Sequence, residues 1–168
     1  LALEAIGMAG NALPVLLSGS LDRIDCRADM TYAAYISGVA IAHAGLGYVH
    51  GLAGPLGGLH EAPHGVLCGS LIGPIHRAMV EQAQRQNDPP ATAFLEKLAR
   101  IAYRWGVDGP QGVVDRIARI TDLADLPGLE SYGFTSDELS RIGTTNPARN
   151  SPVALETAQL IAILSELR

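Results

Sequence analysis

The chain has 168 residues, of which 48% are hydrophobic and 17% charged, and this composition excludes an intrinsically disordered protein. Its net charge of −5 and scattered basic residues give no electrostatic reason to expect nucleic acid, because a nucleic-acid binder presents a basic face. Two cysteines, Cys26 and Cys68, are too few for a disulfide framework and fit a reduced, cytoplasmic setting. We therefore expect one globular domain over residues 1–168.

The N-terminal part of the chain is predicted to be helical. Leu3, Ile6, Ala9 and Leu13 share one helix face, and Pro14 is expected to disrupt its continuation. A second helix is predicted from about Asp25 or Arg27 to His43.

Residues 30–60 contain no Asp, Glu, Lys or Arg, and this stretch is long enough to span a bilayer. It is rich in glycine, contains Pro55, His43 and His50, and lacks basic flanking clusters. Because a helix that is apolar all round also occurs in the centre of globular cores, we expect a buried helix and no membrane span.

Glycine and proline then become dense between residues 44 and 59. Each glycine adds conformational entropy that folding must remove, so such density indicates a loop that a second backbone or a ligand approaches closely. A new helix is predicted to begin at residues 63–65, where proline is tolerated in the first turn, and to run towards Gln84.

Helical spacing continues through the C-terminal half, and no convincing strand pattern interrupts it. Thr135 followed by Glu138 is a capping-box signature, and Ser151-Pro152 is read as a helix start. The remaining expectations are a linker at 87–90 and helical faces over 95–105, 113–120 and 160–167. The sequence therefore predicts an all-α fold of six to eight helices.

Two histidines flank the glycine-rich stretch, and they are the first candidates for chemistry. His50 lies just before it, and His64 opens the helix that follows. The positive potential at a helix N-terminus disfavours protonated imidazole, and a divalent metal requires the neutral form. Two histidines alone are weak evidence, since metal sites generally need three protein ligands or more. From the residues alone, two histidines hydrogen-bonded at helix ends are the slightly favoured alternative.

The motif around these histidines resembles that of a known family. The groups His50-Gly51, Leu56-Gly57-Gly58 and Pro63-His64-Gly65 match, in order and spacing, a motif of the iron-containing alcohol dehydrogenases. Residues 1–6, 44–47 and 145–149 also resemble that family's C-terminal helical domain. The resemblance covers essentially the whole chain.

The resemblance implies a fold, a cofactor set and a reaction. Family members pair an N-terminal Rossmann-like nucleotide domain with a C-terminal helical domain, a dehydroquinate synthase-like arrangement. The helical domain holds Fe²⁺ or Zn²⁺ through an Asp and three His, two of which correspond to His50 and His64. The metal polarises the oxygen of a small alcohol or aldehyde during hydride transfer with NAD(P).

Two departures from the family pattern limit what this chain is expected to do alone. The family's Asp and first His lie upstream of the segment that resembles residues 1–6, and no dinucleotide-binding fingerprint is present. We therefore expect a fragment with half a metal site that binds metal weakly, and a nucleotide domain from the parent chain or a separate subunit. The family often has a further His four residues after the first metal ligand, where this chain has Gly54.

Several alternatives remain open at this stage. Cys68 lies one helical turn after His64 and is either a buried structural cysteine or part of a self-contained zinc site with His50 and either His60 or Glu61. His60 is a catalytic candidate or a solvent-facing loop residue. A non-catalytic helical interaction module with a degenerate metal site is the alternative function. An isolated helical domain also exposes an apolar patch that favours a homo-oligomer.

Overall fold

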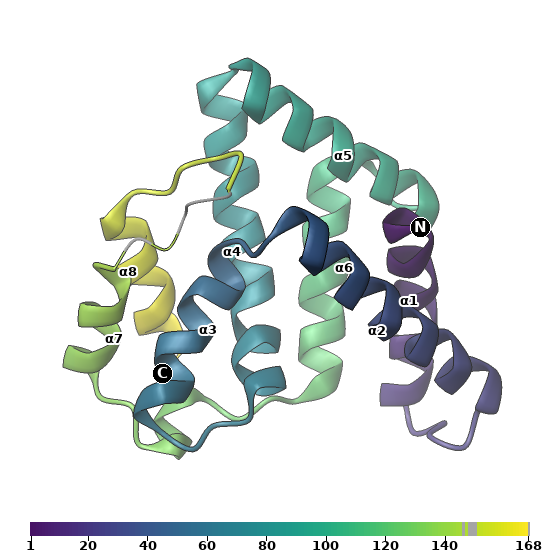
Figure 1. Ribbon diagram of the computed structural model, residues 1–168, viewed down its shortest axis with the longest axis horizontal. Coiled ribbons are helices and arrows are strands. Elements are labelled where there is room, and N and C mark those ends of the chain that lie inside the picture. Colours follow the sequence, from purple (N-terminus) through teal and green to yellow (C-terminus); the bar gives the residue numbers. More distant parts are fainter. Residues whose placement is uncertain (146, 148–150, 168) are drawn as a thin grey trace. The chain divides into compact units, whose positions relative to one another are not determined.

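The computed structural model describes residues 1–145, 147 and 151–167, and within them the chain is all-α (Figure 1). These residues contain no β-strand and form eight α-helices, which confirms the predicted fold class. The helices are α1 (Ala2–Leu17), α2 (Ile24–Ala44), α3 (Tyr48–Leu59), α4 (His64–Gln86), α5 (Pro89–Trp105), α6 (Gly109–Ala124), α7 (Ser136–Gly143) and α8 (Thr157–Glu166), with a 3₁₀ helix, η1, at Leu129–Tyr132.

The helices group into two compact units. The first unit consists of Leu1–Gly45 and Leu95–Ala124, and the second of Leu46–Phe94 and Asp125–Arg168. In the first unit α1 packs against α2 and α6. In the second unit α4 packs against α3 and α8, and α7 packs against α3 and α8.

A single indole joins three helices of the first unit. The Trp105 indole nitrogen, at the end of α5, donates a hydrogen bond of 3.0 Å to the Ile6 carbonyl of α1. From α6, the Arg116 guanidinium lies 5.4 Å from the centre of the Trp105 ring and donates to the Trp105 carbonyl at 2.9 Å. Gly10 lies directly beneath the indole, where a Cβ atom would overlap the ring.

Pro14 does not end the first helix, contrary to the expectation from sequence, because α1 continues to Leu17. A proline inside a helix cannot donate to the carbonyl four residues earlier, which here belongs to Gly10. Arg116 fills that role, since its Nη2 atom donates to the Gly10 carbonyl at 2.8 Å. The tertiary structure thus supplies the hydrogen bond that the local sequence removes.

The second unit has a dense apolar core. Tyr48 is fully buried, and its hydroxyl accepts a hydrogen bond of 2.7 Å from the Leu155 backbone, 107 residues away. Other large side chains in this core are almost completely buried: Leu52, Leu56, Leu67, Leu71, Ile75, Val80, Leu129, Leu139, Leu160 and Leu164.

The glycine-rich stretch is a helix, and its prediction as a loop is wrong. Residues 51–58 lie inside α3, whose Tyr48, Leu52 and Leu56 form one buried face. Packing of this face overrides the weak helix propensity of glycine, which is about 1 kcal/mol per residue. The expected close approach is found at Gly51, where a Cβ atom would lie 3.2 Å from the Pro147 carbonyl oxygen and 2.5 Å from the Pro147 Cβ.

One helix start was predicted correctly from local side chains. Thr135 and Glu138 form the predicted capping box at the start of α7. Two other predictions are wrong. Pro89 and Pro90 start α5 instead of forming a linker, since Asp88 accepts from the Ala91 backbone and caps the helix. Ser151 does not start a helix, because its hydroxyl donates to the Val153 carbonyl and α8 begins only at Thr157.

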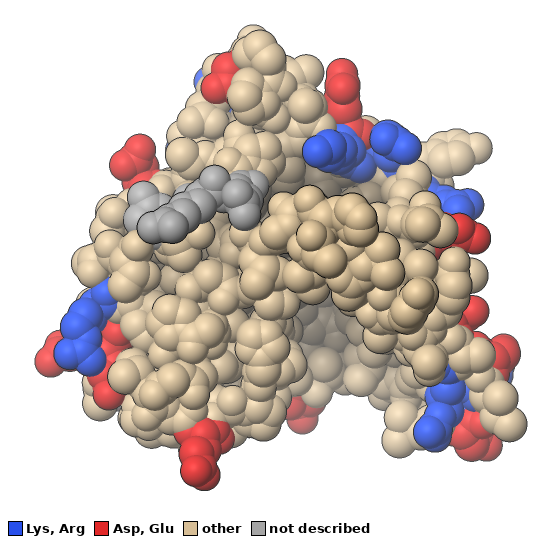
Figure 2. All heavy atoms as spheres, viewed as in Figure 1, with Lys and Arg blue, Asp and Glu red and all other residues tan. Residues whose placement is uncertain are grey.

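The uncharged stretch is divided between α2 and α3. No single helix among the described residues is long and apolar enough to cross a bilayer, and α2 and α3 meet the length and composition only when taken together. Figure 2 shows Lys and Arg interspersed with Asp and Glu on the face in view, without gathering by sign.

The close contact between Gly10 and Trp105 predicts that a methyl group at position 10 lowers the stability of the fold. We expect Gly10→Ala to lower the free energy of unfolding by about 1–3 kcal/mol, because the indole must leave its hydrogen bond to Ile6. Gly38→Ala in α2 is the matched control, since a Cβ atom there meets nothing within 4 Å. It should stabilise by about 0.5–1 kcal/mol. Urea unfolding followed by circular dichroism measures both, and equal effects would contradict this account.

Candidate metal centre

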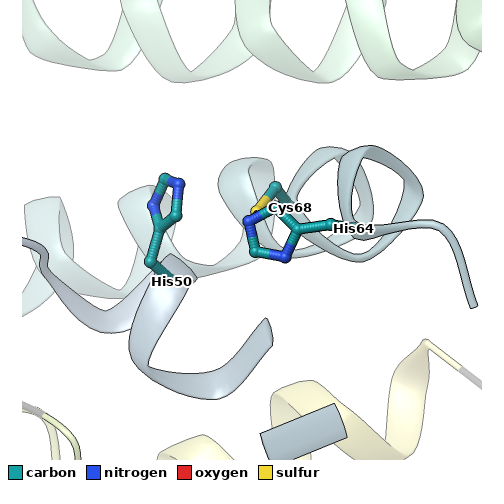
Figure 3. Close-up of side chains that lie close together, drawn as sticks. All are labelled: His50, His64 and Cys68. Carbon is teal, nitrogen blue, oxygen red and sulfur yellow. The ribbon is translucent and has the colours of Figure 1, made fainter. Parts of the chain in front are cut away.

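Three side chains of the second unit converge on one point. His50 comes from α3, and His64 and Cys68 come from the first two turns of α4 (Figure 3). One ligand atom from each residue can be chosen so that all three lie within 4.8 Å of one another. His50 and Cys68 are half-buried and His64 is exposed, so the group lies at the protein surface.

The start of α4 positions two of these groups. Pro63 precedes the helix, and its carbonyl accepts from the Val66 and Leu67 backbone, which makes His64 the first helical residue. Residues four apart share a helix face, so Cys68 lies one turn above His64. The Cys68 sulfur is 3.4 Å from the His64 Nε2 atom.

The third group is carried by α3, which packs against α4. Its buried face anchors the helix, and the close approach of Gly51 to Pro147 constrains the residue next to His50. The ring centres of His50 and His64 are 5.4 Å apart with a tilt of 49°, so the rings are not stacked face to face. A nitrogen atom of each ring lies within 4.8 Å of the other and of the Cys68 sulfur.

The protonation state of Cys68 matters for any metal that binds here. Partial burial raises the pKa of the Cys68 thiol, because the low-dielectric surroundings disfavour the charged thiolate. The thiol is therefore protonated at neutral pH, and a bound metal would have to displace that proton. Both cysteines are free in the structure.

His60, the catalytic candidate from sequence, is not a member of this group. It is the residue that follows the end of α3, and its Nε2 atom is 3.2 Å from the Glu138 carboxylate. Its ring packs edge-on against Phe134 at 4.5 Å. These contacts join the end of α3 to the start of α7, and both side chains of the pair are only 25% exposed.

Two further histidines have local partners. The Nδ1 atoms of His43 and His76 lie 2.7 and 2.8 Å from the carbonyls of Val39 and Ile72, four residues earlier in their own helices. Burial lowers the pKa of His76 and so favours its neutral form. Neither residue belongs to the His50, His64 and Cys68 group.

Two positions that the family resemblance singled out can also be located in the structure. A Cβ atom on Gly54 would meet nothing within 4 Å, so the position where the family often has a histidine is open space. The family-like segment 145–149 lies partly outside the described residues, which include Thr145 and Pro147. Sequence reasoning missed that Pro147 packs on α3, since no local pattern links residues so far apart.

Comparison with known proteins supports the family motif. The family described as "Fe-containing alcohol dehydrogenase family, C-terminal" matches residues 1–166. Alcohol dehydrogenase 4 of Saccharomyces cerevisiae is 28% identical, and the match covers 98% of this chain and 42% of that protein. A 1,3-propanediol dehydrogenase of Citrobacter freundii is 39% identical over 75% of this chain and 32% of its own length. This chain thus spans less than half the length of these relatives.

Solved structures show the same fold. A crystal structure of 1,3-propanediol oxidoreductase matches with a TM-score of 0.80 and 23% identity, over 99% of this chain and 44% of that one. An iron-containing alcohol dehydrogenase from Corynebacterium glutamicum matches with a TM-score of 0.76 and 22% identity, over 98% of this chain and 43% of that one.

The Glu138 carboxylate predicts a pH dependence of stability. Hydrogen bonds from the Thr135 backbone and side chain and from His60 lower the pKa of Glu138 from 4.5 to about 2. A lowered folded-state pKa stabilises the fold above the unfolded-state value, and this contribution is lost as the pH falls from 4.5 towards 2. We therefore expect Glu138→Gln to destabilise the protein at neutral pH, with the difference from the parent chain narrowing in acid.

Urea unfolding at neutral pH and at about pH 3 measures this difference. Glu81→Gln, at an exposed position of α4, is the control and should leave stability nearly unchanged at both pH values. A destabilisation by Glu138→Gln that stays constant across this range would show that the carboxylate's charge is not responsible.

Proposed function

This chain belongs to the Fe-containing alcohol dehydrogenase family, and on that premise we propose that it is the metal-binding half of an NAD(P)-dependent oxidoreductase. His50 and His64 hold Fe²⁺ or Zn²⁺ in this proposal. The observation that carries it is the convergence of these two imidazoles, 5.4 Å apart, from the two helices that bear the family motif.

The residues present fit a divalent transition metal. Imidazole nitrogen suits both zinc and iron, and the neighbouring Cys68 adds a softer donor within 4.8 Å. When bound, the metal would supply Lewis-acid polarisation of a substrate oxygen. Because His64 is exposed, the site is open to a ligand from solvent or from another protein surface.

The chain's own residues orient and support the ligands. The buried Tyr48, Leu52 and Leu56 hold α3 in place, so that His50 is presented from a rigid helix. Ligands on packed helices keep their geometry better than ligands on loops. The chain therefore contributes a preorganised pair of imidazoles to the reaction.

The nicotinamide cofactor belongs to another part of the enzyme in this proposal. The relatives named as alcohol and 1,3-propanediol dehydrogenases are more than twice as long as the region matched here. We propose that a nucleotide-binding domain, in the parent chain or in a separate subunit, supplies NAD(P) and further metal ligands. The free cysteines agree with the reduced, cytoplasmic setting that we assign to the enzyme.

The proposed substrate is a small alcohol or aldehyde. Gly54 stands where the family often has a reaction-site histidine, and the space beside it is open. We therefore propose only a substrate class, and we assign proton transfer to no residue of this chain.

Metal binding by the purified chain tests the ligand assignment. We expect His50→Ala and His64→Ala each to weaken Zn²⁺ binding by at least about tenfold, because each removes one donor atom. Titration against a chromogenic competitor measures affinity, and circular dichroism should show unchanged helical content. His43→Ala is the control, since that exposed imidazole is bonded within its own helix. If both ligand variants bind metal like the parent chain, the assignment is wrong.

A further inference from the structure

We propose that Cys68 is the third protein ligand of this centre, so that His50, His64 and Cys68 form a self-contained His₂Cys site that prefers Zn²⁺ to Fe²⁺. The inference rests on the proposed function, because it shares His50 and His64 with it. It departs from the half-site expected from sequence, since one chain then supplies three donors of two chemical kinds.

The separations of the donor atoms are close to those around one zinc ion. With Zn–N and Zn–S bonds of about 2.0 and 2.3 Å, tetrahedral angles place the two donor atoms about 3.5 Å apart. The Cys68 sulfur and the His64 Nε2 atom are 3.4 Å apart. The three ligand atoms lie within 4.8 Å of one another, so small side-chain rotations bring them to the separation that a common zinc ion requires.

The positions of the donors are determined by helix geometry rather than by flexible loops. His64 and Cys68 are one turn apart on α4, and α3 packs against that helix with His50 half-buried. Figure 3 shows the His64 ring directed towards His50, with the Cys68 sulfur beside it. Metal binding therefore needs small side-chain rotations and no rearrangement of the backbone.

The donor chemistry determines the preferred metal. Imidazole binds both zinc and iron, whereas a thiolate is a soft ligand that suits zinc. Adding Cys68 to the two histidines therefore favours zinc. On binding, the Cys68 thiol releases its proton to solvent and forms a sulfur–metal bond, which leaves a net charge of +1 on the ion and its three ligands. Three protein ligands leave the fourth tetrahedral position open to water or a substrate oxygen.

Cobalt absorption spectroscopy of the full chain tests the role of Cys68 directly. Co²⁺ replaces Zn²⁺ in tetrahedral sites, and a bound thiolate gives an intense near-ultraviolet charge-transfer band. We expect this band in the parent chain and in Cys26→Ser, whose substituted residue lies in α2 of the first unit. Cys68→Ser should lose the band and weaken Zn²⁺ binding by at least about tenfold.

A second measurement uses the unmodified protein and does not depend on how a variant folds. Stoichiometric Zn²⁺ should slow alkylation of Cys68 by iodoacetamide severalfold, as read by mass spectrometry of the Cys68 peptide, because a metal-bound thiolate is not available to attack.

The outcomes separate this inference from the proposed function. If the His variants weaken Zn²⁺ binding but the parent shows no charge-transfer band and no protection of Cys68, the inference is overturned and the proposed function stands. If neither the His nor the Cys68 variants change metal binding, both fail. A band that requires all three residues establishes the His₂Cys centre.

Discussion

The packing of α3 against α4 is the constraint on which the candidate centre depends. α3 ends at Leu59, the chain turns through residues 60–63, and Pro63 starts α4 at His64. Packing of the two helices brings His50, in the first turn of α3, next to His64 and Cys68, in the first two turns of α4. The His60–Glu138 contact holds the turn against α7, so the corner is tied to the core of the second unit rather than left as a free loop.

Both units use a side chain from a distant segment to satisfy a backbone group that local structure leaves without a partner. In the first unit, Arg116 donates to the Gly10 carbonyl that Pro14 cannot serve. In the second, the Tyr48 hydroxyl accepts from the Leu155 backbone in a segment outside any helix. A buried backbone group without a partner costs about 1–3 kcal/mol, so these contacts stabilise a proline-containing helix in one unit and a non-helical segment in the other.

The proposed centre combines the two histidines of the family motif with a cysteine from the same helix as His64. The two histidines occur in the motif shared with the family, whereas Cys68 joins them through its place one turn after His64. The open space at Gly54 is a second local difference, since a glycine there offers no side chain to a substrate. Our proposal is therefore a site with a soft donor from Cys68 and with no side chain at position 54.

The sequence by itself determined the all-α class, most helix positions, the α7 capping box and the pairing of His64 with Cys68, because each depends on side chains within four residues of one another. The tertiary structure decided the rest. It continued α1 through Pro14 with a hydrogen bond from Arg116 to the Gly10 carbonyl, 106 residues apart, and it folded residues 51–58 as a helix by burying one face. It also placed His60 against Glu138 and brought His50 to His64, since such contacts depend on packing between helices that no local pattern encodes.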